Sequence, residues 1–272
     1  MTGEDESLDA FAVLGRVGSL VTRLARDADE VARAQALRFD VFHTEMGARS
    51  TPEQARTGRD LDALDAHCDH LLVIDTAADD ALVGTYRLLD PEGARAAGGW
   101  YSAGEFDLTP MLTAVPGRRF LELGRSCVAP AWRNRRTMEL LWHGAWSLAL
   151  AKRADVLFGC ASLPGTDPSR HGGALAFLAR EAAMDAGHDV TARGHNAVRL
   201  ADHAGTPFDS RRALASLPPL VKGYLRLGAR VGGEAHVDPA FGCIDLLVAL
   251  DVARINPRYL AHYGVDASRF SA

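Results

Sequence analysis

A short run of apolar residues interrupted by two charges, Phe120–Val128 (FLELGRSCV), constrains the fold more than any other stretch. Its apolar spacing is typical of a buried β-strand, which Ala129-Pro130 should end before a helix begins. The two charges, Glu122 and Arg125, stand three positions apart. Charges are costly to bury unless they meet a partner or a substrate. The run therefore predicts a core strand that carries a functional site.

The sequence around this strand is strongly basic. Between Arg118 and Arg136 there are six arginines and one acidic residue, whereas the whole chain has a net charge of −5. The overall charge argues against nucleic acid as the main partner, because nucleic-acid-binding domains are usually basic. A local basic segment that follows an acidic strand residue predicts an anionic ligand beside a proton acceptor.

The apolar pattern along the chain predicts an α/β fold. Helical spacing or helix-start signals occur in the ranges 29–46, 133–152, 167–184 and 219–227. Strand patterns occur at 70–75, 82–89, 119–128, 155–161, 229–237 and 243–250. This order predicts a single domain with a mixed, mostly antiparallel sheet flanked by helices.

Other stretches have weaker patterns. Within an N-terminal segment, 1–26, residues 8–24 fit either an amphipathic helix on a membrane surface or a first strand and a turn. The domain itself is expected over 27–253, with a tail at 254–272. Inside the domain, 47–69 is predicted to be a polar loop and 186–217 an insert or mobile loop.

Several chemistries lack the motifs they need. The chain has no GxGxxG dinucleotide-binding turn, no GxxxxGK[ST] phosphate-binding loop and no GxSxG nucleophile elbow. The sequence therefore gives no support for hydride or phosphoryl transfer. The four cysteines form no CxxC pair and fit buried thiols in a reducing compartment. The acids and histidines of 60–70 lack a fixed ligand spacing, so no metal is predicted. No apolar run approaches the roughly 20 residues that cross a bilayer, so a cytoplasmic protein is expected.

Two sets of residues carry a resemblance to known enzymes. The first is Arg38 and Phe42, Asp62 and Asp65, Arg87, and Glu122 with Arg125, which together resemble the signature of the acyl-homoserine-lactone synthases. The second is VGTYRLL, WYSAGEFDL, FLELGRSCV, LFGCASLPG and PPLVKGYLRLGA, which more closely resemble the ornithine lipid N-acyltransferases. Both groups have the GNAT fold of N-acyltransferases. The resemblance spans roughly 33–253 and implies transfer of a 3-hydroxyacyl group from acyl carrier protein to the α-amino group of ornithine.

The resemblance also implies roles for single residues. Glu122 would accept the proton of the attacking amine, with Arg125 as the second catalytic residue. Asp62 and Asp65 would hold the ammonium groups of ornithine, and Arg38, Arg87 or Arg125 its carboxylate. The remaining members of the substrate-binding set are Arg38, Phe42, Arg87, Cys127 and Val128, the last two near a backbone N–H for the thioester oxygen. An internal ion-pair network that braces the sheet is the alternative for the charged members.

The start of the long helix bears on the acyl donor. GNAT enzymes that use coenzyme A have Arg/Gln-x-x-Gly-x-Gly/Ala there, whereas this chain has Arg133-Asn-Arg-Arg-Thr-Met, without glycine. This favours the acyl-phosphopantetheine of a carrier protein as the donor, with no bound cofactor. Carrier proteins of this kind are acidic, so Arg133, Arg135 and Arg136 are predicted to dock one. A solvated basic helix end is the alternative.

Three other functions stay open. One is lactone synthesis with S-adenosylmethionine as acceptor, and another is N-acylation of a different amino acid such as lysine, glutamine or glycine. The third is a catalytically silent module that binds a carrier protein or a lipid. Because a product with one acyl chain is amphiphilic, peripheral contact with the inner membrane face is also expected.

Overall fold

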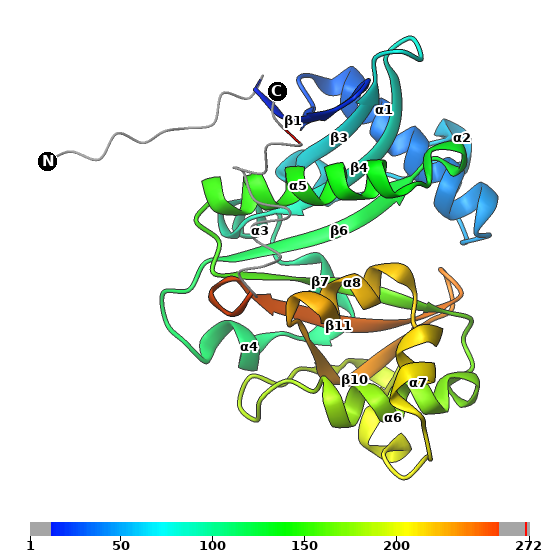
Figure 1. Cartoon of the computed structure of the whole chain (residues 1–272), viewed down its shortest axis with the longest axis vertical. Helices are drawn as coiled ribbons and strands as arrows, with labels where there is room; N and C mark the ends of the chain where they lie inside the picture. The colour runs from blue at the N-terminus through cyan, green and yellow to red at the C-terminus, as the bar shows by residue number, and fades with distance from the viewer. Residues whose placement is uncertain (1–11, 256–269, 271–272) are drawn as a thin grey trace, which may run out of the picture.

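The computed structural model describes residues 12–255 and 270 (Figure 1). Across this part of the chain runs one nine-stranded sheet with the order β1-β2-β3-β4-β6-β7-β11-β10-β9. Its strands are β1 (Val13–Val17), β2 (Leu20–Leu24), β3 (Asp69–Asp75), β4 (Ala81–Leu89), β6 (Phe120–Val128), β7 (Val156–Pro164), β9 (Ala197–Arg199), β10 (Arg230–Asp238) and β11 (Cys243–Asp251). Two short strands, β5 (Phe106–Asp107) and β8 (Thr191–Ala192), pair separately.

Helices cover the sheet on both faces. They are α1 (Ala28–Phe39), α2 (Pro52–Thr57), α3 (Pro91–Ala96), α4 (Thr109–Thr113), α5 (Arg135–Ala151), α6 (Gly172–Glu181), α7 (Ser210–Ser216) and α8 (Pro219–Leu227). The long helix α5 lies across β1 to β4, and α8 lies against β7 and β11 (Figure 1). The predicted α/β class, with a mixed and mostly antiparallel sheet flanked by helices, is confirmed.

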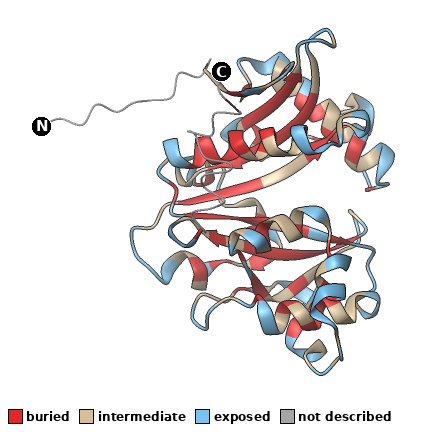
Figure 2. Cartoon of the chain, viewed as in Figure 1, coloured by how far each residue is buried: buried red, intermediate tan, exposed pale blue. Residues whose placement is uncertain are grey.

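Strand β3 shows why helices form a layer on each face. Leu71 and Val73 belong to the large core cluster that includes the α5 side chains, whereas Leu72 and Ile74 pack with Ala34 of α1. Successive strand residues point to opposite faces, so a continuous apolar run needs cover on both. Figure 2 shows the result, with buried strands between helices whose outer faces are exposed.

The sheet opens between β6 and β7, its two parallel strands. Their ladder joins only Phe120–Glu122 to Val156–Phe158, although β6 continues to Val128 and β7 to Pro164. At the end of the ladder, a Cβ on Gly159 would lie 2.1 Å from the carbonyl oxygen of Leu123. A residue with a side chain would therefore push the two strands apart, so glycine permits their close approach here. Beyond this fork the strands diverge.

Local predictions differ in outcome. Of the two alternatives for 8–24, the structure has strands, β1 and β2, over its described part. The predicted loop at 47–69 is wrong, because it contains α2 and a 3₁₀-helix at Ala63–His67. Helix α2 begins at a capping box of Thr51 and Gln54 and ends at Gly58 in the left-handed conformation. Residues 186–217 include β9, which pairs with β10, and α7. Most of the predicted tail lies outside the described residues.

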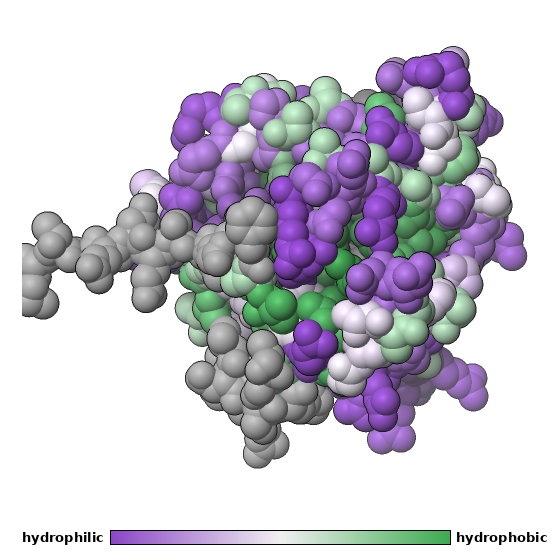
Figure 3. All heavy atoms as spheres, turned by 90° about the horizontal axis from the view of Figure 1, so that it is seen from above, coloured by the Kyte–Doolittle hydropathy of each residue, from purple (hydrophilic) through white to green (hydrophobic). Residues whose placement is uncertain are grey.

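In the described ranges, no helix is both long enough and apolar enough to cross a membrane. Figure 3 shows one face on which hydrophilic and apolar residues are interspersed.

Candidate active site

A cavity of about 140 Å³ lies at the fork between β6 and β7. Strand β6 contributes residues 122–126, including Glu122 and Arg125, and β7 contributes 160–162. Phe42, which follows α1, and Tyr101 close other parts of the wall. The structure therefore brings three of the predicted site residues, Phe42, Glu122 and Arg125, to one cavity.

A β-bulge lies in the part of β6 that lines this cavity. Thr85 pairs with Cys127 and Arg87 with Gly124, so two residues of β6 face the single residue between them on β4. The first of the two, Arg125, has a left-handed φ of 55°. Bulges re-aim side chains and leave one residue outside the ladder. The bulge accounts for a charged side chain in the cavity wall at this point of a core strand.

Arg125 is held by aromatic and acidic neighbours. Its guanidinium carbon lies 4.7 Å from the ring centre of Tyr101 and 4.8 Å from that of Phe241. Its Nη1 donates to the Tyr101 hydroxyl at 3.1 Å, and its Nε is 3.2 Å from Asp60 Oδ2. Burial opposes the charge, but Tyr101 and Asp60 outweigh it and raise the pKa of Arg125. Arg125 is therefore a fixed cation in the cavity wall, suited to a carboxylate.

Glu122 lies where the β6–β7 ladder ends and is 3% exposed. The N–H of Tyr101 donates to its Oε2 at 2.8 Å, and the N–H and Oγ of Ser102 donate to Oε1 at 2.7 and 2.5 Å. Burial raises the pKa of Glu122, while Ser102, Tyr101 and the charge of Arg87 oppose the shift. The carboxylate thus lines the cavity and also anchors the turn at Tyr101–Gly104.

Sequence reasoning missed three further acids of the cavity wall, Glu105, Asp238 and Asp245. Glu105 follows the turn that Glu122 anchors, and Asp245 interrupts the apolar run of β11. Burial, followed by the charge of Asp245, raises the pKa of Glu105 to about 8. The signal for Asp245 was present in the sequence, because it breaks a buried strand as Glu122 does.

The raised pKa of Glu105 predicts a pH-dependent stability. Its pKa rises from 4.5 to about 8 on folding, so the folded state binds more protons between these values and loses stability as pH rises through them. Glu105→Gln removes this penalty, so the variant should exceed the wild type in unfolding free energy by roughly 2–4 kcal/mol at pH 8. The difference should vanish below pH 4.5, where both side chains are neutral. Urea unfolding at pH 4.5 and pH 8 measures it, and a pH-independent difference would contradict this account.

The other predicted charged residues form a buried network beside the cavity. Arg38 lies 2.9 Å from both Asp60 Oδ2 and Asp65 Oδ1, and Arg87 lies 2.7 Å from Asp62 and 3.0 Å from Asp65. Among the described residues that line the cavity, none comes from these five. The roles of Arg38, Arg87, Asp62 and Asp65 in holding ornithine stay predictions. The geometry favours the alternative, a network that ties α1 and the 62–67 turn to β4.

Cys127 and Val128 are buried at the far end of β6, past the residues that line the cavity. Burial raises the pKa of the Cys127 thiol to about 12. The thiolate is the nucleophilic form of cysteine, so a thiol held neutral is a poor candidate for an acyl-cysteine intermediate. This favours direct transfer of the acyl group.

The three arginines predicted to dock a carrier protein are exposed at the start of α5. Arg133 forms an ion pair with Glu45 at 2.5 Å, and Arg135 with Glu139 at 2.8 Å. Surface ion pairs of this kind are weak and can exchange partners with an incoming acidic surface. Docking stays a prediction for Arg133, Arg135 and Arg136.

Comparison with known proteins supports the fold and identifies the family. Residues 37–143 match the acetyltransferase (GNAT) domain family. The chain is 48% identical to the L-ornithine N(alpha)-acyltransferase of Rhizobium meliloti (strain 1021), over 97% of this chain and 90% of that protein. It is 46% identical to the protein of the same name from Agrobacterium fabrum (strain C58 / ATCC 33970), over 97% of this chain and 91% of that protein. The structure of FeeM, an N-acyl amino acid synthase from uncultured soil microbes, aligns with a TM-score of 0.55 at 12% identity and covers 92% of this chain and 99% of that chain.

Proposed function

The chain belongs to the family of the L-ornithine N(alpha)-acyltransferases and is an N-acyltransferase that acts on ornithine, and from that premise we propose its donor, its product and its chemistry. The donor is a 3-hydroxyacyl group on the phosphopantetheine of acyl carrier protein, and the product is lyso-ornithine lipid. The observation that carries the proposal is the cavity at the β6–β7 fork, which Glu122 and Arg125 both line.

The reaction forms one bond and breaks one. The α-amino nitrogen of ornithine attacks the thioester carbonyl carbon, the C–N bond forms, and the C–S bond breaks to release the phosphopantetheine thiol. Glu122 takes the proton of the amine, directly or through a water, and the leaving sulfur gains a proton. Arg125 binds the α-carboxylate of ornithine.

The bulge in β6 supplies a place for the oxygen of the thioester. Attack turns this oxygen into an oxyanion, which backbone N–H groups stabilise when they are fixed before the reaction. Arg125 and Ser126 form the bulge and line the cavity, whereas Cys127 and Val128 do not line it. We assign the oxyanion contact to the bulge.

The carrier-protein donor is supported by the start of α5. The segment Arg133–Met138 has no glycine, and its three arginines are exposed. A diphosphate would need a close approach to backbone N–H groups, which glycine permits, whereas an acidic protein needs an exposed basic surface. Peripheral membrane contact belongs to the same proposal, since the amphiphilic product has to reach a bilayer.

Lipid analysis tests the proposal. The chain is produced in a host that makes no aminolipids, and extracted lipids are analysed by mass spectrometry. A new mono-acylated ornithine is the expected product, absent when Glu122→Gln is produced to the same level. An acyl-lactone would instead identify a lactone synthase, and another acylated amino acid would replace the acceptor. No new lipid from folded protein with carrier protein present would favour the binding module.

The donor is tested with purified components. Ornithine is offered the same 3-hydroxyacyl group on acyl carrier protein or on coenzyme A. We expect a kcat/KM at least tenfold higher for the carrier protein, since charge complementarity accelerates encounter and orients docking. Equal values would overturn the carrier-protein assignment and leave ornithine acylation in place.

A further inference from the structure

The cavity wall is more acidic than the proposed chemistry requires. Of the described residues that line it, four are acids, namely Glu105, Glu122, Asp238 and Asp245, and one is a cation, Arg125. Glu122 has the catalytic role proposed above. The other three, called the acidic wall below, have no salt bridge to any residue that the structure describes. Of the three, Asp245 is buried, and burying an acid without a paired cation is unfavourable.

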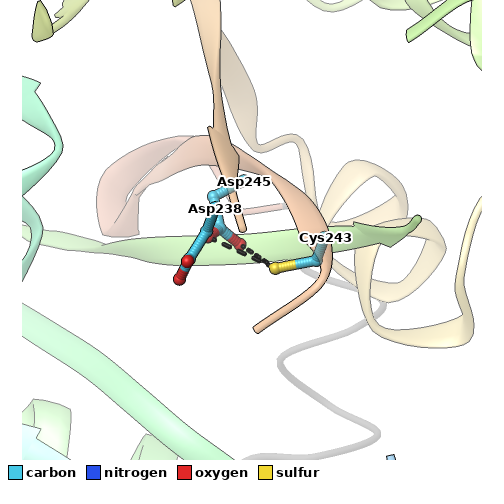
Figure 4. A group of neighbouring side chains, drawn as sticks. All are labelled: Asp238, Cys243 and Asp245. Atoms are coloured by element: carbon cyan, nitrogen blue, oxygen red, sulfur yellow. Dashed lines mark hydrogen bonds between the residues drawn. The ribbon is translucent and has the colours of Figure 1, made fainter. Parts of the chain in front are cut away.

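Asp245 is the most deeply buried member of the acidic wall, at 5% exposed. On β11 it pairs across the ladders with Ser162 of β7 and His236 of β10. Its Oδ1 accepts from the Ser162 hydroxyl at 2.5 Å, and the Cys243 thiol lies 3.5 Å from Oδ2 (Figure 4). A neutral hydroxyl and a thiol position this carboxylate without neutralising it. It is therefore a buried carboxylate beside a cavity, held in place and without a salt bridge among the described residues, although the charge of His236 acts on it.

Glu105 and Asp238 add two further carboxyl groups beside Asp245. Glu105 Oε2 has the Cys160 thiol 3.5 Å away as a donor, which is weak. Asp238 Oδ1 accepts from the N–H groups of Ala240 and Phe241 at 2.7 and 3.1 Å, which fixes the turn after β10. Burial and the charge of Asp238 raise the pKa of Asp245, and burial and the charge of Asp245 raise that of Glu105. Burial and repulsion between the acids together outweigh the opposing charges of Arg125, which acts on Glu105, and of His236, which acts on Asp245.

We infer that the acidic wall, with Asp245 at its centre, binds the side-chain ammonium of ornithine and so selects an acceptor with two amino groups. The inference rests on the ornithine acylation described above. Ornithine carries two ammonium groups and one carboxylate. The carboxylate would meet Arg125 and the reacting amine Glu122, which leaves the second ammonium for Asp245 and Glu105. An ammonium placed there relieves their repulsion and gains charge-assisted hydrogen bonds.

A metal ion is the competing occupant. Ligand atoms of Asp238, Cys243 and Asp245 all lie within 4.8 Å of one another (Figure 4). Metal-bound cysteine is a thiolate, whereas burial, followed by the charge of Asp245, raises the pKa of the Cys243 thiol. The neutral thiol and the substrate's own second cation favour the ammonium.

The test compares two acceptors that differ only at the position in question. L-Norvaline has the carbon skeleton of L-ornithine without the terminal amino group. Asp245→Asn keeps the shape and an oxygen for the Ser162 hydroxyl but removes the charge. We expect kcat/KM for ornithine to fall roughly 30- to 1,000-fold, mainly through KM, because removing one partner of a buried charge pair has effects of this size. The value for norvaline should change less than about threefold, within the range of neutral substitutions.

A matched control comes from the same strand. Asp251 of β11 pairs with Arg118 at 2.8 Å and lies outside the cavity, so Asp251→Asn should keep the wild-type preference for ornithine. Calorimetric binding of ornithine and norvaline to wild type and Asp245→Asn gives the same ratio without turnover. Equal losses for both acceptors would overturn the inference, as would ornithine turnover that stops with EDTA and returns with a divalent cation. Wild-type protein that binds ornithine selectively but acylates neither acceptor would instead contradict the proposed function alone.

Discussion

Glu122→Gln is expected to lower kcat by about 10²–10⁴-fold, because the amide cannot accept the proton of the attacking amine and general-base catalysis contributes that much. The ornithine KM should change little, since Arg125 and the acidic wall remain. The substitution is nearly isosteric, and the amide oxygen can still accept from both Ser102 donors, but the N–H of Tyr101 then faces the amide NH2 and loses its acceptor. Steady-state kinetics with the carrier-protein donor measure kcat and the ornithine KM separately, and thermal unfolding shows whether the variant is folded.

Two control variants separate the proton-transfer role from the anchoring role of Glu122. Ser102→Ala removes the hydroxyl donor to Oε1 and leaves both backbone donors in place, so it should cost less than about tenfold in kcat if anchoring is secondary. Glu105→Gln should act mainly on the KM for ornithine. If Glu122→Gln keeps its turnover while Glu105→Gln loses it, then Glu105 is the base and Glu122 only supports the turn. Its pKa of about 8 makes Glu105 the natural rival.

The sequence predicted the layers of the fold because periodicity records burial directly. Strand β3 reads as a continuous apolar run, and the structure covers both of its faces. Glu122 and Arg125 were predicted from their cost in a buried strand, and both line the cavity. These predictions needed only the spacing of apolar and charged residues within one segment. The structure adds the positions of β3 and β6 in the sheet.

The bulge in β6 and the acidic wall could not be predicted in this way, because both depend on contacts between segments that are far apart in the sequence. The bulge at Arg125 depends on how β6 pairs with β4, and the run signals it only through the neighbouring Gly124, since an isolated glycine in a strand can mark a bulge. The acidic wall joins Glu105, from a turn, to Asp245, which is more than a hundred residues further along the chain. In contrast, helix α2 could have been predicted from the sequence. Thr51 and Gln54 form a capping box with Pro52 at the first helical position, a signal that an argument from composition alone does not use.

The network around Asp65 shows that a motif residue expected to bind substrate can instead belong to an internal ion-pair network. Asp62 and Asp65 have the positions that the family resemblance associates with substrate, yet the structure surrounds Asp65 with Arg38, Arg87 and Gln35. A carboxylate saturated by internal donors has little capacity left for a ligand. A structural role for Asp65 predicts that its substitution lowers stability, whereas a substrate-binding role predicts that it raises the KM for ornithine.

Asp65→Asn is expected to lower the unfolding free energy by about 3–5 kcal/mol, because it leaves two buried arginines without their shared counter-ion. Burial opposes ionisation of Asp65, but Arg38 and Arg87 outweigh it and lower its pKa from 3.8 to about 2. A lowered pKa gives stability that is present above pH 3.8 and is lost as pH falls through 2. Urea unfolding should therefore show the full difference at pH 7 and a smaller one below pH 4.

Asp62→Asn is the matched control, since its side chain is 29% exposed and pairs with Arg87 from the edge of the network. It should cost about 1 kcal/mol, as a partly exposed ion pair does. If Asp65→Asn costs no more than Asp62→Asn but raises the KM for ornithine, then Asp65 contacts the substrate as the resemblance implies. A large loss of stability with an unchanged KM would instead assign Asp65 to the scaffold. The ammonium groups of ornithine would then be left to the acids that line the cavity.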